Sequence, residues 1–169
     1  MARAKNNYRL PLDIKKITHW HKRASRAHVG SLKHSLDFYA PEGTRIKAAA
    51  DGEVVWIRDT YQGGGLSKKI YFAKSNLIVI KHKNNEYTNY EHNKYKSAKV
   101  LIGQKVKRGQ IIAEVGSVGW VGLTKTGALD PELHFEVFTN PSKRYSEGET
   151  LQVVFNIPRI SRCTRRCYE

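Results

Sequence analysis

The stretch "DPELHFEVF" carries three side chains that could bind a metal ion or transfer a proton, and they stand at alternate positions: Glu132, His134 and Glu136. Alternating polar and apolar residues are typical of a strand with one buried face, so these three side chains are expected on the polar face. Histidine is a common zinc ligand, which makes His134 a candidate metal ligand. A single imidazole on a strand does not make a metal site, and the other ligands must come from elsewhere in the chain.

The elements that position this histidine are predicted to be strands. No long stretch has helical periodicity, and "PEGT" and "DG" are typical of turns. We therefore expect a mainly β fold, an antiparallel β-sandwich or barrel-like sheet. Residues 58–75 and 116–131 are too long for hairpin turns and are expected to form loops that wall a groove. The segments rich in β-branched and aromatic residues are "EVVWI", "NLIVIKH", "EYTNYEH", "QKVKRGQIIAEVG" and "LHFEVF".

The length of 169 residues suits a single domain. We expect that domain at residues 28–158, with residues 1–27 as a segment leading into it and residues 159–169 as a basic tail. The tail holds the two cysteines, Cys163 and Cys167, which could form a small disulfide or stay reduced. They offer too few ligands for a zinc site of their own.

The charge of the chain is strongly basic: 30 lysines and arginines against 15 acidic residues give +15, while 40% of the residues are hydrophobic. The hydrophobic content argues against disorder. The basic excess suits a solvated surface or attraction to a polyanion, and no base-stacking or groove-reading motif supports nucleic acid as that polyanion. No segment has the length of a membrane span, and the start "MARAKNNYRLPLDIKK" lacks the apolar region of a secretory signal.

Four segments, in order along the chain, resemble the lysostaphin-like (LytM-type) zinc endopeptidases, which cut peptide cross-bridges in peptidoglycan. The segments are "LDFYAPEGTRIKAAADGEVV", "NLIVIKHKNNEYTNYEHN", "VLIGQKVKRGQIIAEVGSVG" and "PELHFEVF". The resemblance implies a duplicated-hybrid-motif-like fold, Zn²⁺ as cofactor, and Asp37 and His134 as two ligands. It also implies that His92, in "NYEHN", assists catalysis from a facing strand. Two imidazoles and one carboxylate leave the fourth zinc position open to water, as catalytic sites require.

The first histidine ligand departs from the family pattern, in which a histidine stands four residues before the aspartate, where this chain has Lys33. His34 lies three residues before Asp37, and on a strand an odd offset points the two side chains to opposite faces. His28 lies nine residues before Asp37, across a turn, and resembles a longer-spaced version of the motif. We expect His28 to be the third ligand, with His34 as the alternative.

A second departure is Glu132, which replaces the first histidine of the family's His-x-His strand. It could act as a general base, become an extra ligand that blocks the site, or mark a domain that only binds. The expected function is a zinc-dependent endopeptidase acting on peptidoglycan cross-bridges, with Glu132 and His92 as catalytic residues. The alternative is a catalytically inactive LytM-type domain that binds a wall polymer or a protein partner.

The partner expected from this interpretation is peptidoglycan or an anionic wall polymer, bound by a monomer. The expected location is the cell envelope or the exterior if a leader has been removed. Otherwise the protein is made in the cytoplasm without a signal, as a phage-type lysin is.

Overall fold

The computed structural model describes residues 2–22, 28, 30–141 and 148–155. Its strands are β1 (His19–Lys22), β2 (Leu36–Tyr39), β3 (Arg45–Lys47), β4 (Gly52–Arg58), β5 (Gly64–Gly65), β6 (Leu77–Lys81), β7 (Tyr87–Glu91), β8 (Lys105–Val106), β9 (Ile111–Glu114), β10 (Gly119–Trp120), β11 (Glu132–Thr139) and β12 (Glu149–Thr150). A short helix, α1 (Lys68–Tyr71), and 3₁₀ turns at Ile14–Lys16, Gly30–Leu32, Phe72–Lys74 and Lys83–Asn85 complete the described elements.

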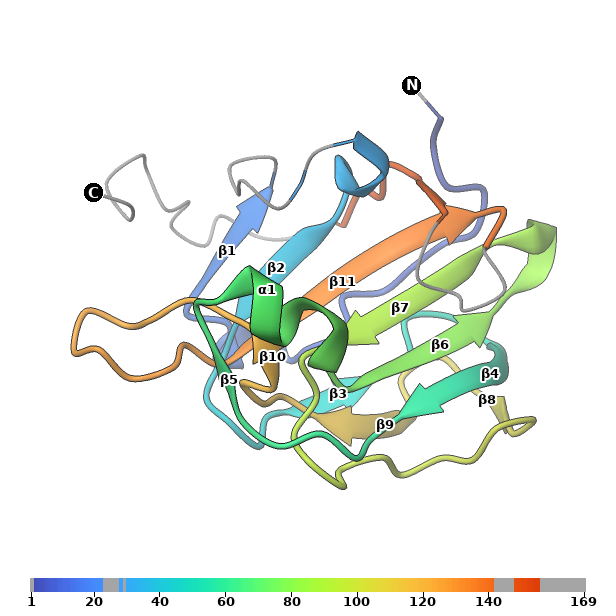
Figure 1. Ribbon diagram of the computed structural model, residues 1–169. Helices are drawn as coiled ribbons and strands as arrows, with labels where there is room; N and C mark the ends of the chain where they lie inside the picture. Colours follow the sequence, from blue (N-terminus) through green and yellow to red (C-terminus); the bar gives the residue numbers. More distant parts are fainter. Residues whose placement is uncertain (1, 23–27, 29, 142–147, 156–169) are drawn as a thin grey trace.

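One large antiparallel sheet dominates the molecule. Its strands run in the order β1-β2-β11-β7-β6-β4-β8, and β12 pairs with the end of β11 (Figure 1). Two small sheets accompany it: β3 pairs antiparallel with β9, and β5 pairs parallel with β10. The mainly β, antiparallel fold expected from the sequence is confirmed, but the large sheet does not close into a barrel.

The two faces of β11 explain why this strand lies at the centre. Leu133, Phe135 and Val137 are completely or almost completely buried and belong to the main hydrophobic core. Phe135 packs edge-on against Tyr90 of β7, with the ring centroids 5.3 Å apart. The residues between them are polar and lie on the opposite face, because side chains alternate along a strand. Apolar packing therefore fixes the strand, and the strand presents its polar residues in a defined order.

The expected strand segment at residues 104–116 is divided between two sheets. β8 pairs with β4 in the large sheet, whereas β9 pairs with β3. A turn separates them, in which Gly109 has φ +89° and Asp51 accepts a hydrogen bond from the backbone N–H of Arg108 at 2.7 Å. Glycine adopts this left-handed conformation without steric penalty, so the chain can change sheets here.

The two long loops contact each other. The first, residues 58–75, contains β5 and α1, and the second, residues 116–131, contains β10. The parallel pairing of β5 with β10 joins them, and the indole N–H of Trp120 donates to the carbonyl of Leu66 at 2.9 Å. The loops are therefore tied together beside the sheet instead of standing apart as separate hairpins.

The N-terminal segment packs on the sheet. Tyr8, Leu12 and Ile17 are buried in the main core. The carboxylate of Glu86 accepts hydrogen bonds from the backbone N–H of Lys5 and the hydroxyl of Tyr8, at 2.6 and 3.0 Å. These contacts join residues 2–17 to the core of the domain that follows. Among the described residues, no helix is long and apolar enough to cross a membrane.

Candidate metal centre

Strand pairing brings the first two candidate ligands together. β2 and β11 are neighbours in the sheet, and Asp37 lies directly opposite His134. Residues opposite each other on paired strands point to the same face. The Nδ1 atom of His134 lies 2.8 Å from an Asp37 carboxylate oxygen, so the two side chains are in direct contact.

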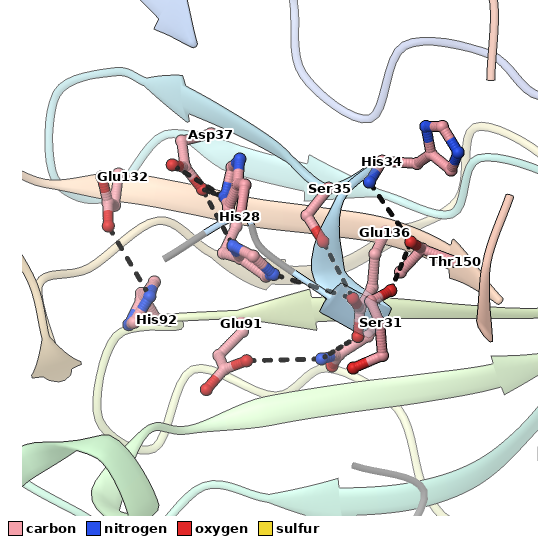
Figure 2. A network of polar contacts seen from close by, with 12 residues as sticks. His28, Ser31, His34, Ser35, Asp37, Glu91, His92, Glu132, Glu136 and Thr150 are labelled. Atoms are coloured by element: carbon pink, nitrogen blue, oxygen red, sulfur yellow. Dashed lines mark hydrogen bonds and ion pairs between the residues drawn. The ribbon is translucent and has the colours of Figure 1, made fainter. Parts of the chain in front are cut away.

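The third candidate ligand, His28, comes from outside the sheet. It lies in a bend just before the 3₁₀ turn at Gly30–Leu32. Its Nε2 atom is 3.1 Å from each carboxylate oxygen of Asp37. His28, Asp37 and His134, which we call the ligand group, offer ligand atoms that all lie within 4.8 Å of one another. Figure 2 shows His28 reaching Asp37 from the neighbouring segment.

His34, the alternative ligand, does not join this group. Its imidazole points away from Asp37 in Figure 2, and its backbone N–H donates to the hydroxyl of Thr150 at 3.2 Å. The next residue, Ser35, shares the face of Asp37, as expected from an offset of two. The structure therefore brings the longer-spaced His28 to Asp37. His34 lies in the turn before β2, so its position does not follow from alternation along a strand.

The electrostatics of the ligand group favour a positive charge at its centre. Burial alone would raise the pKa of Asp37, but the contacts with His134 and His28 outweigh burial and lower it. Burial alone would lower the pKa of His134, but Asp37 and Glu136 outweigh it and raise that pKa well above 6.5. The carboxylate is therefore ionised, and a cation beside it is stabilised.

The donor set fits zinc. Zn²⁺ accepts histidine nitrogen and carboxylate oxygen at about 2.0–2.2 Å, which puts neighbouring ligand atoms of a tetrahedral site about 3.3 Å apart. The nitrogen–oxygen distances of 2.8 and 3.1 Å are close to that value. Three protein ligands correspond to a catalytic zinc site, because the fourth position stays available to water or substrate.

A second pair of titratable side chains lies beside the ligand group. The Nε2 atom of His92 is 3.6 Å from a carboxylate oxygen of Glu132, and we call these two residues the proton-transfer pair (Figure 2). His92 follows β7 and has φ +68°, a left-handed conformation that costs free energy in a residue other than glycine. Its Nδ1–H donates to the carbonyl of Val118 at 2.9 Å, which leaves Nε2 facing Glu132.

Burial moves the proton affinities of this pair toward each other. Burial and, next, the charge of Asp37 raise the pKa of Glu132 well above 4.5. Burial lowers the pKa of His92 below 6.5. A glutamate made more basic and a histidine made less basic, with Nε2 and a carboxylate oxygen 3.6 Å apart, suit the exchange of a proton in acid–base catalysis.

Three buried polar residues near the site were not identified as functional from the sequence: Ser35, Asn89 and Glu136. Glu136 accepts hydrogen bonds from the Ser35 hydroxyl at 3.0 Å and from the Asn89 amide at 3.3 Å. Alternation along β11 indicates that Glu136 shares a face with His134, but the neighbours on β2 and β7 depend on strand register. Cys163 and Cys167 lie outside the described residues.

Comparison with known proteins defines the class. The model of Peptidase family M23 matches residues 31–146, and the chain belongs to this family of zinc metallopeptidases. The resemblance to LytM-type enzymes is therefore confirmed at the level of the family. A crystal structure of a zinc-containing peptidase from Vibrio cholerae superposes with a TM-score of 0.51 and 32% sequence identity, covering 80% of this chain and 37% of that one.

Two curated relatives have different described roles. The peptidoglycan DD-endopeptidase ShyC of Vibrio cholerae is 32% identical over 136 residues, covering 78% of this chain and 27% of that protein. The murein hydrolase activator EnvC of Escherichia coli (strain K12) is 38% identical over 98 residues, covering 58% of this chain and 19% of that protein. The chain spans a third or less of the length of the curated relatives it matches.

Proposed function

We propose that this chain is a zinc-dependent endopeptidase that hydrolyses peptide bonds in peptidoglycan cross-bridges. The observation that carries the proposal is the convergence of the ligand group on one point of the sheet, with the proton-transfer pair beside it. Asp37, His28 through Nε2 and His134 through Nδ1 would hold the ion. Bound zinc supplies Lewis acidity, which lowers the pKa of water and polarises a carbonyl group.

The residues of the chain supply the proton transfers. The Glu132 carboxylate accepts a proton from the attacking water and delivers it to the leaving amine. Its raised pKa makes it a stronger base than an ordinary glutamate. Glu132 is thus assigned the role that the family gives to a histidine.

His92 stabilises the negative charge that develops on the carbonyl oxygen. Because its Nδ1–H is engaged by the Val118 carbonyl, only Nε2 can donate to that oxygen. Nε2 must carry a proton to do so, and the Glu132 carboxyl at 3.6 Å is the group that can supply it. The pair therefore acts as one unit that holds a single mobile proton.

A second candidate function is supported by the same residue. Glu132 stands where the family has a histidine, and a carboxylate turned to the metal can occupy the position that water needs. An M23 domain of this kind would bind a wall polymer or a protein partner without cutting it, and EnvC is named as an activator of murein hydrolases. For either function we propose a location at the cell envelope or outside the cell, where peptidoglycan lies.

Zinc content and peptide cleavage, measured on one preparation, test the proposal. Protein purified without added metal should contain about one zinc ion per chain and release new amino groups from purified peptidoglycan. Asp37→Ala, which removes the central ligand, is the control and should lose both properties. Zinc without cleavage would favour the second candidate. No zinc even after reconstitution would contradict the metal site and the mechanism together.

A further inference from the structure

A second row of polar side chains lies beside Asp37 and His134, beginning two residues away from each of them along the chain. Asp37 and His134 face each other across β2 and β11. Next to them, Ser35, Glu136 and Asn89 form a row that we call the support row, in which Glu136 lies opposite Asn89. Because side chains alternate, the support row lies on the same face as the ligand group. Ser35 and Glu136 appear beside each other in Figure 2.

The centre of the support row is a buried carboxylate. Glu136 is 5% exposed, and Ser35 and Asn89 are 0% and 3% exposed. An ionised carboxylate is costly to bury unless hydrogen-bond donors surround it. Ser35 donates to one carboxylate oxygen and Asn89 to the other, at 3.0 and 3.3 Å. These two donors, one just before β2 and one on β7, fix the orientation of the carboxylate.

The remaining neighbour of this carboxylate is the ligand histidine. The Nε2 atom of His134 lies 3.9 Å from the Glu136 oxygen that also accepts from Ser35. The other ring nitrogen, Nδ1, lies 2.8 Å from Asp37. The imidazole therefore lies between two carboxylates, one at the ligand group and one in the support row. Each carboxylate faces a different ring nitrogen.

We propose that Glu136 is a positioning residue for the zinc ligand His134. Its carboxylate lies at ion-pair distance from Nε2 of His134, 3.9 Å, and so favours the tautomer that keeps a proton on Nε2 and leaves the Nδ1 lone pair facing Asp37 and the metal. Metal-ligating histidines commonly donate their other ring N–H to a carboxylate, which fixes the ring and strengthens the ligand. The inference rests on the proposed function, because the ligand role of His134 belongs to it.

A second buried glutamate provides a matched control. Glu86 is 1% exposed, and its carboxylate also accepts several hydrogen bonds. Its partners are Lys5, Asn6 and Tyr8 of the N-terminal segment, whereas Glu136 faces a ligand residue. Glu86→Gln and Glu136→Gln therefore make the same chemical change in equally buried carboxylates with different neighbours.

The experiment compares the zinc affinity of the wild type, Glu136→Gln and Glu86→Gln by competition with a chromophoric chelator, on protein whose folding is checked by circular dichroism. Glu136→Gln should bind zinc about 10–100-fold more weakly. Glu86→Gln should stay within about threefold of the wild type, because its carboxylate touches no ligand.

If Glu136→Gln does not fold, Ser35→Ala, which removes one donor to Glu136, replaces it and should weaken zinc binding by a smaller factor. Equal affinities for wild type and the Glu136 or Ser35 variant, or an equal loss in Glu86→Gln, would overturn the proposal.

Nuclear magnetic resonance of the ¹⁵N-labelled His134 ring tests the contact without relying on zinc. Metal-free wild type should show a slowly exchanging Nε2–H proton, shifted downfield by the carboxylate, and Glu136→Gln should lose it or move it upfield. An Nε2–H signal that is identical in both proteins would overturn the positioning role. Failure of the wild type to bind zinc, with this spectral difference intact, would contradict the proposed function and leave the Glu136 contact supported.

Discussion

Two residues of the ligand group, Asp37 and His134, and the histidine of the proton-transfer pair are held by different kinds of structure. Asp37 and His134 are paired across two central strands whose opposite faces pack into the hydrophobic core. His92 instead lies just past the end of β7 with a left-handed backbone, and a loop carbonyl, that of Val118, orients its ring. The positions of Asp37 and His134 thus depend on the sheet, whereas the position of His92 depends on a loop.

From this difference we expect the proposed metal binding and the proposed hydrolysis to be separable. A change in the loop that carries Val118 can turn His92 away from Glu132 and leave the ligand group untouched. A change in the register of β2 against β11 would remove both metal binding and hydrolysis.

Loss of a ligand should abolish metal binding, and loss of the alternative histidine should not. His28→Ala removes one of three ligands, so zinc affinity should fall by more than about 100-fold, beyond the loss that follows removal of a supporting residue. His34→Ala should stay close to the wild type, because its ring points away from Asp37. Zinc content after dialysis against a weak chelator measures both. If His34→Ala lost its metal and His28→Ala kept it, His34 and not His28 would be the third ligand.

The pH dependence of zinc binding should report the proton on His134. In the metal-free protein Asp37 and Glu136 outweigh burial and raise the pKa of this residue well above 6.5, so its imidazole keeps its proton to a higher pH than an ordinary histidine does. Zinc requires the neutral ring, and binding must release that proton. Apparent affinity should therefore rise with pH, by up to about tenfold per pH unit over the range in which His134 of the metal-free protein is still protonated. Calorimetry in two buffers of different ionisation enthalpy counts the proton. Binding without proton release near neutral pH would contradict this electrostatic description.

The smallest effect concerns the basic surface, which lies outside both groups. Exposed lysines lie on both sides of β7 and at the start of β8: Lys81, Lys83, Lys94 and Lys105. If they help to hold an anionic wall polymer, binding should weaken by at least about threefold between about 0.05 and 0.5 M salt, because salt screens exposed charges. Zinc content should not change. Polymer binding that is independent of salt in a sedimentation assay would exclude the electrostatic contribution.

The sequence predicted the sheet and the places of Asp37 and His134 more completely than it predicted the surroundings of His28, His92 and Glu136. Alternation on "LHFEVF" and the Asp37 motif depend on local pattern, and the strands formed as expected because their apolar faces needed burial. The position of His28 required knowledge of a turn and a path outside the sheet. The contact between His92 and Val118 depends on how a long loop folds back, which no local pattern encodes. The role of Glu136 depends on strand register, which sets its partners Ser35 and Asn89.

The central claim is that Glu132 replaces the family's histidine as a working base. The most direct test is the cleavage of a cross-bridged peptidoglycan peptide by wild type, Glu132→Gln and Glu132→His at matched zinc content. We expect an active wild type and a Glu132→Gln variant that keeps its zinc but is slower by about two to four orders of magnitude, since glutamine cannot accept the proton. An inactive wild type together with activity gained in Glu132→His would contradict it, and would assign the chain to the binding members of the family.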